Sequence, residues 1–179
     1  MTEYSVTELA AVRSEVKQPP DFTRFWDSVR ADLSTVPVEW ERIPDATWTT
    51  DELTVDWLRF SSVDDQLIYG WLAVPHEAGS MQRNGYLWLP GYSFGNPPPR
   101  RESLYSKTVT FGPNVHGNTP DTPYIHPATQ NREYITEGIE SPQTYAYRGI
   151  VAHCLRALDV LKEQPEVNPD KLIVGGMSQ

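Results

Sequence analysis

The sequence has almost no cysteine and is short of positive charge. Cys154 is the only cysteine among 179 residues, so the chain cannot form an internal disulfide. Its 15 lysine and arginine residues are outnumbered by 24 aspartate and glutamate residues, which gives a formal net charge of -9 at pH 7. Such a charge would be repelled by a phosphate backbone or an anionic membrane, so we expect neither nucleic acid nor a membrane as a partner.

Long apolar runs are missing as well. No stretch approaches the roughly 20 apolar residues that a membrane span needs. The start of the chain at Met1 lacks both the basic region and the apolar core of a signal peptide. Together with the single cysteine, these absences predict a cytoplasmic, reduced setting.

What remains is the composition of one globular domain. Hydrophobic residues make up 39% of the chain and charged residues 22%, which is typical of a folded protein with its own core. We find no internal repeat, low-complexity tract or linker. The sequence therefore predicts a single domain over residues 1–179, which the motif at its end marks as incomplete.

Residues 1–36 are predicted to form a helical segment that packs on a sheet. A short helix is expected near residues 6–16, and a stronger one after Asp21, whose side chain should cap the first turn. Apolar residues then recur at spacings of three and four and so share one helical face. They are Phe22, Phe25, Trp26, Val29 and Leu33.

The next part of the chain has the period-two pattern of strands. Residues 54–60 and 67–74 are rich in β-branched and aromatic residues and are joined by a short polar link, which predicts an antiparallel pair. Residues 38–43 are expected to add an edge strand, and 85–89 and 107–111 further strands. The irregular segment from Gly112 to about Pro142 is long enough to indicate a functional or disordered loop.

The strongest helix is predicted to begin at Pro142 with Ser141 as its cap, and to end near Pro165. The helix is expected to link the strand at 107–111 to the last strand in a βαβ crossover. Adjacent helical residues point about 100° apart, so His153 and Cys154 cannot meet as a base and a nucleophile. We expect Cys154 in the core, and His153 either at the surface or in a supporting position behind the residues of the site. The apolar stripe that predicts the helix consists of Tyr147, Val151, Cys154, Leu158 and Leu161.

The end of the chain has most of a nucleophile elbow. Residues 168–170 indicate a turn, residues 171–174 a short run of the kind buried in a parallel sheet, and Gly176 to Ser178 a sharp turn out of that strand. In the full motif, G-x-S-x-G, a strained strand-to-helix turn lifts the serine hydroxyl above the sheet. Gly176 is the first glycine, and the second would be residue 181. The pattern predicts Ser178 as a nucleophile in a fold truncated just after its elbow.

An oxyanion hole is expected beside Ser178. The residue after the nucleophile, Gln179, would supply one main-chain N–H group, and Tyr92, in the loop after the strand at 85–89, would supply the other. By itself, the stretch 89–92 is more typical of an ordinary strand-ending turn than of an oxyanion loop.

A metal site was weighed for the irregular segment. His116, Asp121 and His126 offer ligand types within a short stretch, but their spacing matches no known zinc pattern. We therefore expect neither a metal nor another cofactor.

These motifs resemble the acetyl xylan esterase and cephalosporin-C deacetylase family of α/β-hydrolases along nearly the whole chain. The resemblance implies an α/β-hydrolase fold in which antiparallel N-terminal strands lead into a parallel sheet with flanking helices. The most specific likeness is the closing 176–179, because that family typically follows its nucleophile with Gln and Gly. The other matching stretches are 21–26, 68–75, 90–92, 145–149 and 155–159.

The resemblance also implies roles and a substrate. Ser178 would be the nucleophile of a serine esterase, the N–H groups of Tyr92 and Gln179 would hold the oxyanion, and Tyr92 would also contact the substrate. Such proteins remove acetyl groups from short decorated sugars, some also from a cephalosporin, and commonly assemble as cyclic homo-oligomers. The chain departs from the family at 114–118, where an Arg-Gly-Gln stretch is usual and only Gly117 is kept.

The catalytic acid and base of such an enzyme are absent from this chain. In this fold they follow the serine, whereas all histidines here precede it: His76, His116, His126 and His153. Residues 1–179 alone are therefore expected to be inactive and prone to aggregate. Two alternatives stay open: a non-catalytic short form that acts as a binding module, and a peptidase or dienelactone hydrolase of the same fold. A serine in the elbow, where the latter has cysteine, counts against the dienelactone hydrolase.

Overall fold

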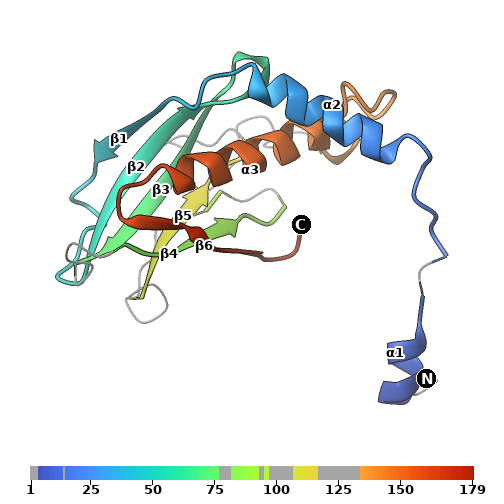
Figure 1. The fold of residues 1–179 in the computed structure, drawn as a ribbon, viewed down its shortest axis with the longest axis horizontal. Coiled ribbons are helices and arrows are strands. Elements are labelled where there is room, and N and C mark those ends of the chain that lie inside the picture. The colour runs from blue at the N-terminus through green and yellow to red at the C-terminus, as the bar shows by residue number, and fades with distance from the viewer. Residues whose placement is uncertain (1–3, 14, 77–81, 93–94, 97–106, 117–133) are drawn as a thin grey trace.

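The described strands form one mixed, six-stranded sheet in the order β1-β2-β3-β5-β4-β6 (Figure 1). The computed structural model describes residues 4–13, 15–76, 82–92, 95–96, 107–116 and 134–179. The helices are α1 (Val6–Ala11), α2 (Phe22–Ser34), η1 (Val63–Asp65), η5 (Tyr134–Thr136) and α3 (Ala146–Lys162). The strands are β1 (Trp40–Pro44), β2 (Leu53–Ser61), β3 (Leu67–Pro75), β4 (Arg83–Leu89), β5 (Thr108–Pro113) and β6 (Val167–Gly176).

The first three strands are antiparallel, as the sequence predicted. β2 pairs with β3 along its whole length, from Leu53 opposite Pro75 to Ser61 opposite Leu67, and β1 pairs with β2 at the edge. The polar link between β2 and β3 turns through Asp64 and Asp65, which have φ of 57° and 54°. Aspartate is one of the few residues that adopt the left-handed region readily, which suits this tight connection.

β4 lies between β5 and β6 and is parallel to both. The predicted connection through α3 therefore runs from β5 past β4 to β6, because β6 pairs with β4. The turn predicted at 168–170 is a bulge within β6: Asn84 pairs with Asn168, but Gly85 pairs with Leu172. The Asn168 side chain accepts a hydrogen bond from the Asp170 N–H at 3.0 Å, which stabilises the extra residues.

α3 begins at Ala146, four residues later than the sequence predicted. The Ser141 side chain accepts a hydrogen bond from the Gln143 N–H at 3.2 Å, so it caps an isolated turn and no helix. Tyr145 then has an extended backbone, with φ of -64° and ψ of 128°, which prevents that turn from continuing into α3. Ser141 and Pro142 therefore mark a turn, but the helix that they were expected to open begins later.

α3 covers one face of the sheet and builds the main core. Its residues Ala157, Val160 and Leu161 are fully buried against apolar side chains of the sheet. The strand residues of this core are Leu58, Phe60, Ile68, Leu72, Leu87, Val109, Phe111 and Val167. Cys154, which the sequence placed in the core, is half-buried, and burial raises the pKa of its thiol to about 12.

The N-terminal segment differs from the prediction that residues 1–36 pack on the sheet. α2 packs against α3 and η1 through a cluster that includes Val29, Val63 and Ala152. α1 has no buried residue, and Figure 1 shows it far from the sheet. Asp21 is the residue before α2, but its side chain makes no capping hydrogen bond; instead its carbonyl accepts one from the Phe25 N–H at 2.8 Å.

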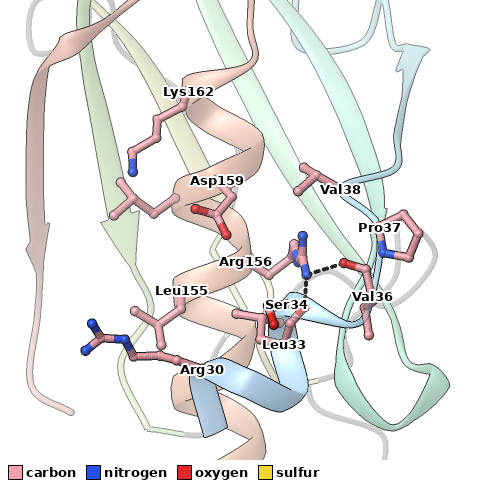
Figure 2. Close-up of a pocket in the computed structure, with 11 residues that line it drawn as sticks. Arg30, Leu33, Ser34, Val36, Pro37, Val38, Leu155, Arg156, Asp159 and Lys162 are labelled. Atoms are coloured by element: carbon pink, nitrogen blue, oxygen red, sulfur yellow. Dashed lines mark hydrogen bonds between the residues drawn. The ribbon is translucent and has the colours of Figure 1, made fainter. Parts of the chain in front are cut away.

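Arg156 joins α2 to α3. Its side chain is 2% exposed, and its Nη2 donates to the Leu33 and Val36 carbonyls at 2.5 and 2.7 Å. These carbonyls lie at the end of α2, where helical carbonyls lack partners within the helix. Figure 2 shows the guanidinium pointing from α3 to this end of α2, in a groove of about 530 Å³. The groove is lined by α2, α3 and residues 36–38, so it is separate from the elbow.

β6 is the outer strand next to β4, and it is less buried than the sequence predicted. Ile173 and Val174 are 49% and 54% exposed. Neighbouring strand residues point to opposite faces, so both faces of β6 are open at these two positions, whereas Val167 and Leu172 pack against the core. None of the helices in the described residues has the length and apolar character to cross a membrane.

Candidate active site

Ser178 lies two residues beyond β6 in a strained backbone conformation. Its φ is 72°, within the left-handed region that non-glycine residues rarely adopt. Such a conformation costs on the order of 1–3 kcal/mol and persists only where the surroundings enforce it. A serine held this way directly after a strand has the backbone geometry that a nucleophile elbow requires.

Glycines allow the elbow to approach β4 and its exit loop. A Cβ on Gly176 would lie 3.1 Å from the Leu89 carbonyl oxygen. A Cβ on Gly91 would lie 3.1 Å from the Met177 carbonyl oxygen and 3.6 Å from the Ser178 Cβ. The exit of β4, which leads directly into Tyr92, is therefore in close contact with the turn that carries Ser178.

Tyr134 connects the residues predicted to form the oxyanion hole. Its hydroxyl donates a hydrogen bond to Gln179 Oε1 at 2.6 Å and lies 2.9 Å from His116 Nε2. Its ring packs on the ring of Tyr92, with centroids 4.9 Å apart. Tyr134 and His116 are each 3% exposed, so these two side chains are shielded from water, whereas Gln179 is exposed.

The network determines which nitrogen of His116 carries a proton. A tyrosine hydroxyl has one proton, and Gln179 Oε1 can only accept, so the Tyr134 proton is used in that bond. His116 Nε2 must then donate to the Tyr134 oxygen. Gln179 Nε2 lies 3.4 Å from the same nitrogen, and this longer contact pairs two donors. His116 Nε2 is therefore committed to Tyr134 and is not available as a base.

Two further tyrosines extend the aromatic cluster. The ring of Tyr147 lies 6.3 Å from that of Tyr134, and 5.2 Å from that of Tyr145. Desolvation raises the pKa of Tyr147, and the nearby Tyr145 and Tyr92 raise that pKa further. The Tyr147 phenol therefore stays neutral at physiological pH.

Within the described residues, no imidazole hydrogen bonds to the Ser178 hydroxyl. The His76 ring contacts Thr54 Oγ1 and the Asp51 carbonyl, both at 2.9 Å. The His153 Nδ1 lies 2.8 Å from Ser62 Oγ. His126 lies outside the described residues.

His153 is buried, so of its two predicted places the one at the surface is wrong. The side chain is 8% exposed, because α2 and η1 cover the side of α3 that the sequence left open. Burial lowers the pKa of His153 to about 4, the nearby charge of Asp64 opposes this shift, and that of His116 adds to it. The imidazole is therefore neutral near pH 7.

Of the three candidate metal ligands, only His116 lies in the described residues. His116 belongs to the Tyr134 network, whereas Asp121 and His126 lie outside the described residues. In the part of the chain that the structure describes, no three His, Cys, Asp or Glu side chains gather as metal ligands.

Sequence reasoning missed Tyr134 and the role of His116 beside it. Tyr134 lies in the irregular segment between 112 and 142, where no periodicity or motif marks a residue. It meets Gln179 from a distance of 45 positions in the sequence. Only the tertiary fold shows this contact.

A protein-family profile and a known acetyl esterase both match this chain. The profile of a family described as acetyl xylan esterase (AXE1) matches residues 1–179. The acetyl esterase Axe7A of Xylanibacter ruminicola is 26% identical over 172 residues, which cover 91% of this chain and 39% of that protein.

Solved structures agree with this match. The acetyl xylan esterase from Paenibacillus sp. R4 superposes with a TM-score of 0.80 at 20% identity, over 97% of this chain and 56% of that one. Acetyl xylan esterase 1 from Thermoanaerobacterium sp. JW/SL YS485 gives 0.76 at 16%, over 98% and 56%. The predicted α/β-hydrolase fold is confirmed, and the chain spans little more than half the length of these structures.

Proposed function

Because this chain belongs to the acetyl xylan esterase family, we propose that it is the N-terminal part of a serine esterase that removes acetyl groups from short acetylated carbohydrates. The observation that carries the proposal is Ser178, held at a φ of 72° directly beyond β6 and packed against the Gly91 turn. A strained serine in this position is expected of a nucleophile and has no evident structural use.

The proposed reaction begins with attack of the Ser178 Oγ on the ester carbonyl carbon. The carbonyl oxygen becomes an oxyanion, which the main-chain N–H groups of Tyr92 and Gln179 would hold. Collapse of this intermediate expels the sugar alcohol, which takes up a proton, and leaves an acetyl-serine. Water then attacks the acetyl-serine, so that acetate leaves and the hydroxyl is restored.

This reaction needs a base for the serine and an acid that orients the base. His116 Nε2 is engaged by Tyr134, and His153 by Ser62. We therefore assign the base and the acid of the proposed enzyme to residues beyond Ser178, in the order typical of the fold. Residues 1–179 alone would lack both.

The proposal is tested with the protein expressed from the complete gene. The unmutated protein should release acetate from acetylated xylo-oligosaccharides and hydrolyse a nitrophenyl acetate. The Ser178→Ala variant should lose at least about 10³-fold in kcat, because the nucleophile is gone. Ser141→Ala removes a hydroxyl from the exposed turn before α3 and serves as the matched control, with unchanged turnover expected.

The same assays separate the alternatives. A complete gene that stops at codon 179, with a product that binds acetylated sugar but does not turn it over, would support a binding module. Preference for a peptide or for a long acyl chain would support another hydrolase of this fold. Full activity of Ser178→Ala would overturn the serine mechanism.

A further inference from the structure

Tyr134 holds the side chain of Gln179 by a hydrogen bond, in addition to its aromatic contacts. Gln179 is expected to supply an oxyanion N–H from its backbone, yet its side chain is held as well. Its amide oxygen accepts the Tyr134 proton at 2.6 Å, a short hydrogen bond, in a setting where Tyr134 is 3% exposed. This hydrogen bond restrains the Gln179 side chain, and through its Cα also the orientation of the adjoining peptide.

We propose that Tyr134 and His116 are positioning residues that hold Gln179, and through it the peptide N–H next to the nucleophile. This inference deepens the proposed esterase function and depends on it. Because the phenolic proton is used in the bond to Gln179, we assign the His116 Nε2–H as the donor to the Tyr134 oxygen. The hydrogen bonds therefore all run in one direction, from His116 through Tyr134 to Gln179.

The same tyrosine also holds the other predicted oxyanion residue. The Tyr92 ring packs on the Tyr134 ring at 4.9 Å, so one side chain contacts the residues on both sides of the expected oxyanion. An oxyanion hole stabilises charge only when its donors are aimed before the charge develops. Tyr134 is placed to keep both donors aimed at once.

The role proposed for Tyr134 requires its hydroxyl group. A phenylalanine at 134 would keep the ring contact with Tyr92 but release Gln179. Loss of a complete oxyanion donor costs about 10²–10³ in kcat. A donor that remains but is less well aimed should cost less, so we expect Tyr134→Phe to lower kcat about tenfold and to change KM less than twofold.

The decisive experiment is a double-mutant cycle in the protein expressed from the complete gene, assayed on a nitrophenyl acetate. Tyr134→Phe, Gln179→Met and the double variant are compared with the unmutated protein. If Tyr134 acts through the Gln179 side chain, Tyr134→Phe should have no further effect on kcat once Gln179 is Met. His116→Phe should resemble Tyr134→Phe.

The matched control is Tyr145→Phe. It removes a hydroxyl from the same aromatic cluster, one that donates to the Ile135 carbonyl at 3.0 Å. We expect kcat to stay within twofold. A thermal melt of each variant separates misfolding from lost positioning. Gln179→Met is the reference in these melts, because it leaves the buried rings of Tyr134 and His116 intact.

The outcomes are distinct. Independent, multiplying effects of the two substitutions on kcat, or an unchanged kcat in Tyr134→Phe, would overturn this inference and leave the esterase function intact. No turnover by the unmutated protein would overturn the esterase function and this inference with it.

Discussion

At the scale of single residues, the surroundings of His153 keep its imidazole uncharged. The ring is 8% exposed and Nδ1 lies 2.8 Å from Ser62 Oγ, in the contact between α3 and the chain that leads into η1. Burial lowers the pKa of His153 to about 4, whereas histidine in an unfolded chain has a pKa near 6.5. Between these values the unfolded chain binds a proton that the folded protein excludes. His153 therefore favours the folded state above pH 6.5, and this advantage is lost as the pH falls toward 4.

We predict that acidification from pH 7 to pH 5 lowers the free energy of unfolding by about 2 kcal/mol through His153 alone. Urea titrations at a series of pH values measure this. The His153→Gln variant should be less stable at pH 7 but should lack this part of the pH dependence.

His76→Gln makes the same substitution at an exposed imidazole and serves as the matched comparison. The carboxylates with a lowered pKa, Glu8, Asp45 and Glu166, act in a separate window. Their contribution is lost only below about pH 4.5. An equal slope between pH 5 and pH 7 in the His153→Gln variant would contradict the prediction.

His153 also shows a limit of sequence reasoning about single residues. Of the apolar stripe predicted for α3, only Leu161 is buried, whereas Tyr147, Val151, Cys154 and Leu158 are half-buried. The most buried residues of the helix are Ala152, His153, Arg156, Ala157, Val160 and Leu161. The sequence did not reveal that α3 has a second covered side, because α2 and η1 reach that side only in the folded chain. A helix between two layers buries more of its circumference than one stripe indicates.

At the scale of elements, the strand pairs and the start of α2 were predictable, whereas the start of α3 was not. β2 and β3 have clear period-two patterns and a short polar link, so their antiparallel pairing follows from local sequence. Where α3 begins depends on the extended backbone of Tyr145, which a preceding turn imposes. The elbow itself was visible from the Gly176 and Ser178 pattern, whereas Tyr134 beside it required the fold.

The contact between the β4 exit and the elbow yields a prediction for Gly91. A Cβ there would lie 3.1 Å from the Met177 carbonyl oxygen, closer than an ordinary contact, and 3.6 Å from the Ser178 Cβ. We predict that Gly91→Ala shifts the elbow by a few tenths of an ångström and lowers kcat about tenfold. Stability should stay within about 1 kcal/mol, because alanine also reduces the entropy of the unfolded chain. Steady-state kinetics and a thermal melt of the protein from the complete gene measure both.

Gly149→Ala is the matched control for Gly91→Ala. Its Cβ would meet the His153 Nε2 at 3.7 Å, an ordinary contact, within α3. Alanine favours a helix over glycine, so this variant should be as stable as the unmutated protein or more so, with unchanged kcat. A Gly91→Ala variant with full activity would show that the β4 exit and the elbow are not tightly coupled.

At the scale of the whole molecule, the sheet ends in an open parallel strand. β6 pairs with β4 on one side, and the apolar side chains of Ile173, Val174 and Met177 are 49%, 54% and 68% exposed. In the described residues no further strand pairs with β6. An exposed strand edge with apolar side chains is a template for pairing with another chain. The net charge of -9 opposes such pairing through repulsion between copies.

These opposing effects predict how residues 1–179 behave when produced alone. Salt screens the repulsion, because the screening length falls from about 30 Å at 0.01 M to about 8 Å at 0.15 M, while apolar contacts at β6 persist. Light scattering should therefore show association that increases with salt concentration, and an ester assay should show no turnover of an acetyl ester.

Val174→Lys adds a charge to the open strand and should raise the monomer fraction at a given salt concentration. Val12→Lys adds the same charge at a residue that is 66% exposed and directly follows α1, the helix that Figure 1 shows far from the sheet, so it controls for the change in net charge. Equal effects of the two substitutions would mean that net charge, not the open edge of β6, governs association. A monomer that turns over an acetyl ester would contradict both parts of the prediction.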